Sequence, residues 1–347
     1  MLSTLNPHPL DDETAFDEAS HTYTHIKTGR KFPKSVTYLV KKAFPGDFNA
    51  DEVVESNITK WASNSQHKYY SLIRYCTLVL GLSLEETKNE IKKLWSAEGE
   101  EARTEGTDMH FALENWMNGA NYDEKYRYAV SMVENAFRMT FYKNMELKPY
   151  RTEFRVFLTI EVEHPKAPGI KNIVPVLSGT IDALFRDKHN RLWIFDWKRT
   201  DPSKKGKLGT ETVSMFTKKG ADLFKPFSNT DFSKYSLQLI LYKLMLERGG
   251  YLKPGEEVAA CFLCQVHPSM HKPHIVQVLE NMDENEQELF ELSATGLLNA
   301  HIEACKKKEL ERLESAMDAE TEGEDDEVYA NPTASCEDAG DEVEMDE

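Results

Sequence analysis

The sequence predicts a mixed α/β fold, in which a central mixed β-sheet is flanked by helices and preceded by a helical N-terminal elaboration. Three observations predict it. Residues 53–119 carry apolar residues at helical spacing, residues 151–198 contain strand-like segments, and a periodic helix at 233–248 precedes two further strands. The 347 residues, 40% of them hydrophobic, are enough for a sizeable core.

The first part of the chain is expected to be mainly helical after one short hairpin. His21–Val36 predicts the hairpin, because apolar residues flank a Thr-Gly turn and a proline then ends the strand. Ser83 and Glu86 match a capping box, in which both side chains satisfy free backbone donors at a helix start. A second helix is expected over 106–118 and a third over 123–142.

Strands dominate the next part. Arg151–Ile160 alternates between apolar and polar residues, which predicts a strand. Leu177–Arg186 and Arg191–Lys198 predict two more strands, and the polar turn Asp187–Asn190 joins them. The two strands are therefore expected to form a hairpin.

The remaining elements complete the sheet and cover it. A long connection, Thr200–Lys234, leads to a strongly periodic helix over Ser233–Arg248. Val258–Val266 and His274–Leu279 are expected to be strands, and Asp283–Ala316 a long closing helix.

The acidity of the chain is concentrated at its C-terminal end. Residues 311–347 hold sixteen Asp and Glu and one Arg, a net charge of −15 out of −17, so the rest is nearly neutral. This tail has few large apolar residues and is expected to be disordered. It is a solubilising tail, a competitor that mimics nucleic acid, or a tail that binds a protein partner. The rest of the chain is expected to divide into an N-terminal hairpin and helical region, residues 1–104, and a core domain, residues 105–310.

Composition also bounds where the protein works. The five cysteines are scattered, which argues against a disulfide framework and favours a reducing compartment. The N-terminus resembles neither a secretory nor a transit peptide, and no run approaches the roughly 18 apolar residues of a membrane span. A soluble intracellular protein without membrane contact is expected, in either the cytoplasm or the nucleus.

Two acidic residues and a lysine stand in otherwise apolar strands. Asp196 and Lys198 are two residues apart, so their side chains point the same way, and Asp182 lies on the preceding strand. Such charges are costly to bury unless they are paired or bind a metal. Two carboxylates and a lysine suit metal-assisted phosphodiester hydrolysis, because hard oxygen ligands bind Mg²⁺ or Mn²⁺ and an ammonium stabilises developing charge. A purely structural buried ion pair is the alternative.

These residues also match a known pattern. Gly179, Asp182, Asp196 and Lys198 resemble the G-x-x-D … D-x-K motif of the PD-(D/E)XK nuclease superfamily. The resemblance implies a restriction-endonuclease-like core in which Asp182 and Asp196 bind Mg²⁺ or Mn²⁺ and Lys198 positions the attacking water. It also implies that the backbone carbonyl of Trp197 is a metal ligand.

A helical motif precedes the sheet. The residues from Gly106 to Glu114 (GTDMHFALE) are similar to the G-T-x-x-H-x-x-x-E motif of the RecB-like and lambda-exonuclease-like branch of that superfamily. The i,i+4 spacing places His110 and Glu114 on one helical face. The resemblance implies that His110 is a metal ligand supported by Glu114, whereas a lone histidine on a helix is otherwise more often structural.

Two further features fit the same branch. Gln238 and Tyr242 match its Q-x-x-x-Y motif, which implies contact with substrate or with the catalytic lysine. The alternative is a pair of amphipathic residues at a helix edge. Glu153 lies on the strand before the hairpin, where the family often has an acidic residue, and is either catalytic or a surface residue.

One feature of that branch is not expected here. Many of its members bind an iron–sulfur cluster through one upstream cysteine and a C-terminal cysteine triplet. Cys261 and Cys264 lie three apart on a predicted strand and therefore on opposite faces. No iron–sulfur cluster is expected, and both are interpreted as small core residues.

The long connection carries lysines and phenylalanines together. Lys204 and Lys205 are expected to bind substrate, with Phe216, Phe224 and Phe227 as stacking platforms for a single strand. A merely solvated, flexible loop is the alternative.

The sequence therefore predicts a divalent-metal-dependent deoxyribonuclease, by resemblance an exonuclease acting on DNA ends or single strands in recombination, repair or replication. An RNA-directed endonuclease of the cap-snatching type is one alternative. A nucleic-acid-binding module without catalysis is another, but binding alone does not require two buried carboxylates.

Overall fold

A five-stranded mixed β-sheet forms the centre of the fold, as predicted. This computed structural model describes the chain apart from residues 19, 21, 47, 143–144, 212, 214–216 and 325–347 and the side chains of residues 204–205 and 317–324. In spatial order the strands are β4 (Lys148–His164), β5 (Ala167–Arg186), β6 (Leu192–Lys198), β7 (Val258–Gln265) and β8 (His274–Gln277). β6 and β7 are parallel, and the other neighbouring pairs are antiparallel.

Strand β6 is buried on both faces, which explains its almost continuously apolar sequence. Leu192 and Ile194 belong to the core on one side of the sheet. Trp193, Phe195 and Trp197 belong to the core on the other side. The predicted alternation along this strand is therefore confirmed.

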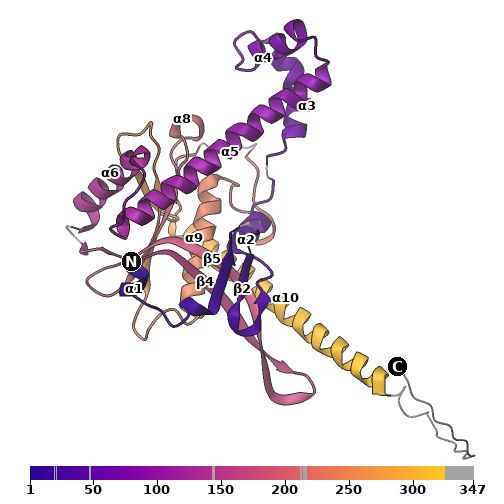
Figure 1. The fold of residues 1–347 in the computed structure, drawn as a ribbon, viewed down its shortest axis with the longest axis vertical. Coiled ribbons are helices and arrows are strands. Elements are labelled where there is room, and N and C mark those ends of the chain that lie inside the picture. The colour runs from indigo at the N-terminus through magenta and orange to yellow at the C-terminus, as the bar shows by residue number, and fades with distance from the viewer. Residues whose placement is uncertain are drawn as a thin grey trace, which may run out of the picture.

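Helices cover both faces of the sheet (Figure 1). The first core lies under α9 (Asp231–Arg248), α10 (Glu284–Glu324) and α2 (Val36–Ala43). The second lies under the C-terminal part of α5 (Leu84–Met117), α6 (Arg127–Ala136) and the π-helical turn η5 (Phe137–Tyr142), with η4 (Glu124–Tyr126) leading into α6. Cys261 and Cys264 belong to different cores, so they lie on opposite faces of the sheet as expected.

Helix α5 is one continuous helix of 34 residues, where two helices were predicted. Its capping box, formed by Ser83 and Glu86, is confirmed. The expected break near Gly106 is absent because a lone glycine costs only about 1 kcal/mol in a helix and no proline ends the hydrogen-bonding pattern there. The helix therefore runs unbroken to the residues beside the sheet.

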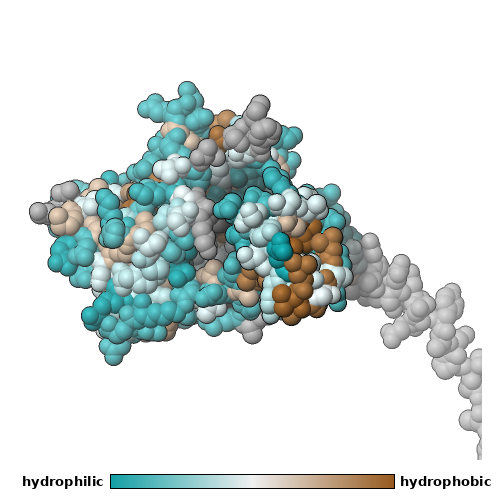
Figure 2. Space-filling model, turned by 90° about the horizontal axis from the view of Figure 1, so that it is seen from above, coloured by the Kyte–Doolittle hydropathy of each residue, from teal (hydrophilic) through white to brown (hydrophobic). Residues whose placement is uncertain are grey.

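The N-terminal end of α5 carries a separate helical knob. The knob consists of α3 (Ala50–Ser63), α4 (Tyr70–Arg74), the π-helical turn η3 (Tyr75–Val79) and the first turns of α5. It has its own small core, which includes Trp61, Tyr69 and Ile91, and it projects from the sheet (Figure 1). Figure 2 looks onto this end of the molecule and shows hydrophobic residues gathered there; Leu78 and Val79 are among the exposed ones.

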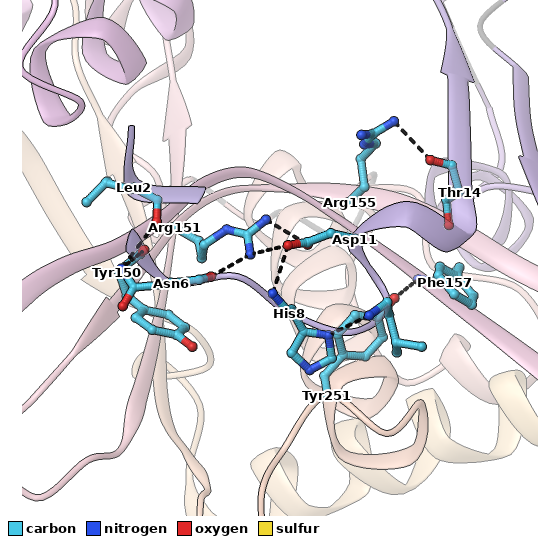
Figure 3. A network of polar contacts seen from close by, with 11 residues as sticks. Leu2, Asn6, His8, Asp11, Thr14, Tyr150, Arg151, Arg155, Phe157 and Tyr251 are labelled. Atoms are coloured by element: carbon cyan, nitrogen blue, oxygen red, sulfur yellow. Dashed lines mark hydrogen bonds and ion pairs between the residues drawn. The ribbon is translucent and has the colours of Figure 1, made fainter. Parts of the chain in front are cut away.

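The N-terminal segment lies across β4 and is held there by polar contacts (Figure 3). It contains α1 (Leu2–Leu5), η1 (Asp11–Glu13), η2 (Ile26–Thr28) and a small antiparallel sheet of β1 (Thr14–Asp17), β2 (Thr22–His25) and β3 (Arg30–Lys31). The Arg151 guanidinium donates to both Asp11 carboxylate oxygens at 2.8 and 3.0 Å, and the His8 ring stacks on Tyr251. The predicted hairpin corresponds to β2 and β3, but β1 was not expected.

The connection between β6 and α9 contains α8 (Pro202–Lys205) and η6 (Asp222–Phe224). Phe224 and Phe227 are buried against Phe44 and Phe290, so their predicted role as stacking platforms is wrong. Their rings serve the core because this connection crosses the apolar face beneath α10. Phe216 lies outside the described residues.

Helix α10 extends to Glu324, beyond the predicted end at Ala316. The added residues include Met, Ala and Glu, which favour helix. Residues 325–347 of the acidic tail are outside the described part of the chain. Among the described helices, none is long and apolar enough to cross a membrane.

Candidate active site

The acidic residues of the predicted catalytic hairpin stand where β5 and β6 separate. The ladder between these antiparallel strands ends at the pair Ala183 and Phe195, whose immediate neighbours in the sequence are Asp182 and Asp196. The backbone N–H of Trp197 donates to Asp182 Oδ2 at 2.8 Å. Asp182 is therefore held across the gap by the strand that carries the other two candidates.

Asp196 and Lys198 form a buried ion pair. Lys198 Nζ lies 2.5 Å from Asp196 Oδ2, and Asp196 is 2% exposed. Burial raises the pKa of Asp196 to about 6, and the charge of Lys198 opposes the rise. Burial alone lowers the pKa of the Lys198 ammonium, but the carboxylates of Asp196 and Asp182 outweigh it and raise that pKa, so the lysine stays charged.

Glu153 sits opposite Asp182, at a point where the β4 backbone departs from strand geometry although the β4–β5 register is kept. Thr152 pairs with Ala183 and Phe154 pairs with Ile181, while Glu153 adopts the left-handed backbone conformation with φ of +43°. This conformation costs a non-glycine residue about 1–3 kcal/mol and is typical of functional sites. The Glu153 side chain is exposed at the cavity, where partial desolvation, reinforced by the carboxylates of Asp182 and Glu114, raises the pKa of Glu153 above its ordinary range.

His110 reaches this group from helix α5. Its Nδ1 lies 3.5 Å from Asp182 Oδ2, and its Nε2 lies 2.8 Å from the carbonyl oxygen of Trp197. In the tautomer that carries its proton on Nε2, His110 donates a hydrogen bond to that carbonyl, and the unprotonated Nδ1 faces the Asp182 carboxylate. A backbone carbonyl commonly orients a metal-binding histidine in this way. Here the Trp197 carbonyl, itself a predicted ligand, contacts His110.

The side chains of His110, Glu153 and Asp182 fit a divalent cation. One potential ligand atom from each lies within 4.8 Å of the others. Carboxylate oxygens and an imidazole nitrogen suit Mg²⁺ or Mn²⁺, and a bound cation would offset the repulsion between carboxylates, which adds to desolvation in raising the Glu153 pKa. Asp196, predicted as a ligand, is not in this group of three; its carboxylate lies against Lys198.

An open cavity of about 530 Å³ gives access to two members of this group, His110 and Glu153. His110, Glu114, Thr107 and Phe111 line it from α5, and Glu153 lines it from β4. The shared helical face predicted for His110 and Glu114 is therefore present, and burial raises the pKa of Glu114. Phe16, Glu18, Arg155 and Thr180 complete the lining.

Tyr242 packs directly on the glycine of the hairpin motif. A Cβ atom at Gly179 would lie 2.6 Å from the Tyr242 ring, which explains why this position needs glycine. The Gln238 side chain donates to the Tyr242 hydroxyl at 3.4 Å, and burial raises the pKa of that hydroxyl. Gln238 is half-buried and Tyr242 is buried. The two motifs are thus in contact, and their predicted substrate contact stays a prediction.

Gly179→Ala is expected to destabilise the fold by about 1–3 kcal/mol, because the added methyl group overlaps the Tyr242 ring. Chemical denaturation measures the effect. Gly106→Ala is the matched control, since nothing lies within 4 Å of a Cβ there and alanine favours the helix. Equal stability of the two variants would contradict the proposed packing role of Gly179.

Two residues near the site were not predicted. Lys198 Nζ lies 4.5 Å from the centre of the Tyr235 ring on α9, and Arg155 lines the cavity from β4. Tyr235 precedes Gln238 by three residues and Tyr242 by seven, a helical spacing that could have placed it on the same face. Arg155 alternates in phase with Glu153 along β4. The side chains of Lys204 and Lys205 lie outside the described part of the chain.

Comparison with known proteins agrees with this site. A model of the PD-(D/E)XK nuclease superfamily matches residues 79–337. A comparison with curated proteins gave no match. Among solved structures, one titled "Crystal structure of SSO0001" is 13% identical; the match covers 57% of this chain and 74% of that chain, with a TM-score of 0.22.

The chain belongs to the PD-(D/E)XK nuclease superfamily, because the family model spans well over half of its length. It is accordingly a metal-dependent nuclease, a hydrolase that acts on nucleic acid. The hairpin with Asp182, Asp196 and Lys198, which carries the G-x-x-D … D-x-K motif, lies within the matched residues.

Proposed function

We propose that this nuclease is a deoxyribonuclease of the RecB-like and lambda-exonuclease-like branch, which degrades DNA from ends or acts on single strands. The observation that carries the proposal is the meeting of two motifs: His110 from the G-T-x-x-H helix lies beside Asp182 and Glu153. The Q-x-x-x-Y pair packs on the same hairpin through Gly179.

Each residue of the site has a proposed role. His110, Asp182 and Glu153 would hold Mg²⁺ or Mn²⁺, with Asp196 as a further ligand and Glu114 supporting His110. When bound, the cation would polarise the phosphoryl group and neutralise its developing charge. The Lys198 ammonium, kept charged by Asp196, would orient the attacking water and stabilise negative charge. Lys204 and Lys205 are proposed to contact the DNA backbone.

Cleavage of labelled oligonucleotides tests this function. Linear single-stranded and duplex DNA, circular DNA and RNA of the same sequence would be incubated with Mg²⁺, Mn²⁺ or EDTA. We expect linear DNA to be shortened with either metal and to stay intact in EDTA. Cutting of circular DNA would rule out a purely exonucleolytic action, and faster cutting of RNA would favour the RNA-directed alternative.

His110→Ala is expected to raise the Mn²⁺ concentration that gives half-maximal activity about 10- to 100-fold, because an imidazole ligand is lost. A metal titration at fixed DNA concentration measures the shift. His189→Ala is the matched control, since His189 lies exposed on the turn after β5. An unchanged metal requirement for His110→Ala would remove His110 from the metal centre.

A further inference from the structure

An exposed phenylalanine stands beside the candidate metal centre. Phe111 follows His110 on α5, lines the same cavity and is 63% exposed. Single exposed apolar residues are common on protein surfaces and need no explanation. This one differs by its place, because its ring borders the space that a substrate must enter to reach His110 and Glu153.

Two other lining residues, Phe16 and Arg155, add a second aromatic ring and a cation. Phe16 from β1 is half-buried, with its ring 4.4 Å from that of Tyr23. Arg155 donates one hydrogen bond to the Thr14 carbonyl at 3.1 Å, and its side chain is otherwise largely exposed. Figure 3 shows this hydrogen bond, which joins β1, the strand that carries Phe16, to β4.

The cavity is lined by both negatively and positively charged side chains. Glu18, Glu114 and Glu153 contribute carboxylates, Arg155 contributes a guanidinium, and Thr107 and Thr180 contribute neutral hydroxyls. A phosphate is repelled by the carboxylates unless a cation is bound and is attracted by the guanidinium. The face of a nucleobase is uncharged, so the carboxylates do not repel it, and stacking on an exposed aromatic ring is favourable.

We propose that Phe111 is a stacking platform for one unpaired base next to the scissile phosphate and that Arg155 contacts the backbone of the same strand. The inference rests on the proposed function and narrows its substrate to a strand with an unpaired nucleotide at the site. A base inside a duplex already stacks on both faces, so it must leave the stack to lie on the ring. The cavity volume of about 530 Å³ falls in the usual range of ligand sites, roughly 300–1,000 Å³.

Binding measurements on Phe111 variants test the platform. The dissociation constant of a fluorescent single-stranded oligonucleotide would be measured with Mn²⁺ in an Asp196→Asn background, which keeps the strand intact. We expect Phe111→Leu to weaken binding about tenfold and Phe111→Tyr to retain it. Phe48→Leu is the matched control, because Phe48 is 66% exposed but is not among the residues that line the cavity.

Abasic oligonucleotides then locate the base. One missing base is moved along the strand, and at one position it should weaken binding to the Phe111 protein about tenfold while adding no loss to Phe111→Leu. Unchanged binding by Phe111→Leu, or an equal loss at every abasic position for both proteins, would overturn the proposal. Failure of the protein with Asp196 intact to cleave any DNA would instead overturn the proposed function, so the two failures are distinguishable.

Discussion

Asp182→Asn and Asp196→Asn are each expected to slow cleavage at least about 100-fold while the protein remains folded. Both substitutions keep the size of the side chain and remove a carboxylate that lies beside His110 or Lys198. Asp182→Asn also relieves repulsion between neighbouring carboxylates, so its free energy of unfolding should change little, whereas Asp196→Asn leaves the buried Lys198 ammonium without its ion-pair partner and should lower the free energy of unfolding. Single-turnover cleavage at saturating metal and thermal unfolding are the two measurements.

Asp187→Asn is the control on the same hairpin. Asp187 is also buried, but it accepts hydrogen bonds from Arg191 and Trp193 at the turn and does not line the cavity. We expect this variant to lose stability and to cleave at a near-normal rate when folded. Near-normal cleavage by folded Asp182→Asn or Asp196→Asn would exclude that residue from the mechanism.

Lys198→Ala is expected to reduce the cleavage rate at saturating DNA and metal about 100-fold or more, because the ammonium beside Asp196 is lost. The variant leaves a buried carboxylate without its partner. Since burial already raises the pKa of Asp196, we expect that carboxylate to take up a proton and the fold to survive. The rate at saturation separates this effect from weaker DNA binding.

Two further variants test the role of Lys198 even if Lys198→Ala does not fold. If Lys198→Ala does not fold, the double variant Lys198→Met and Asp196→Asn removes both charges together and should restore folding but not cleavage. Lys243→Ala is a control, because Lys243 also forms an ion pair, with Glu291, but is not among the residues that line the cavity. A folded Lys198→Ala protein that cleaves normally would show that the ion pair is structural.

The elements of the sheet could be predicted from the sequence because their patterns are local. Alternation in 151–160 and the apolar run of β6 follow from which faces are buried. The continuity of α5 could not be predicted in this way, since a glycine within a helix gives the same pattern as a break between helices. Strand β1 was missed because its four residues depend on pairing with β2 and on contacts of its segment with Arg151 and Arg155.

The candidate site was predicted by motif and not by geometry. Spacing placed Asp196 beside Lys198 and His110 beside Glu114, and the structure has both pairs. It could not show that Glu153 stands opposite Asp182, because the backbone irregularity there has no sequence pattern. The aromatic residues were misjudged for a related reason: hydrophobic type alone does not distinguish the buried Phe224 from the exposed Phe111.

Because α5 is one continuous helix, its number of residues determines how the knob is oriented relative to the sheet. The core of the knob shares no residue with the two cores of the sheet, and α5 joins the knob to His110 without a break. Each residue inserted between them would turn the knob by about 100° around the helix axis and move it about 1.5 Å along it. Seven inserted residues would nearly restore its direction, about 10 Å further away. The hydrophobic end of the knob therefore faces a direction that the number of residues in α5 determines.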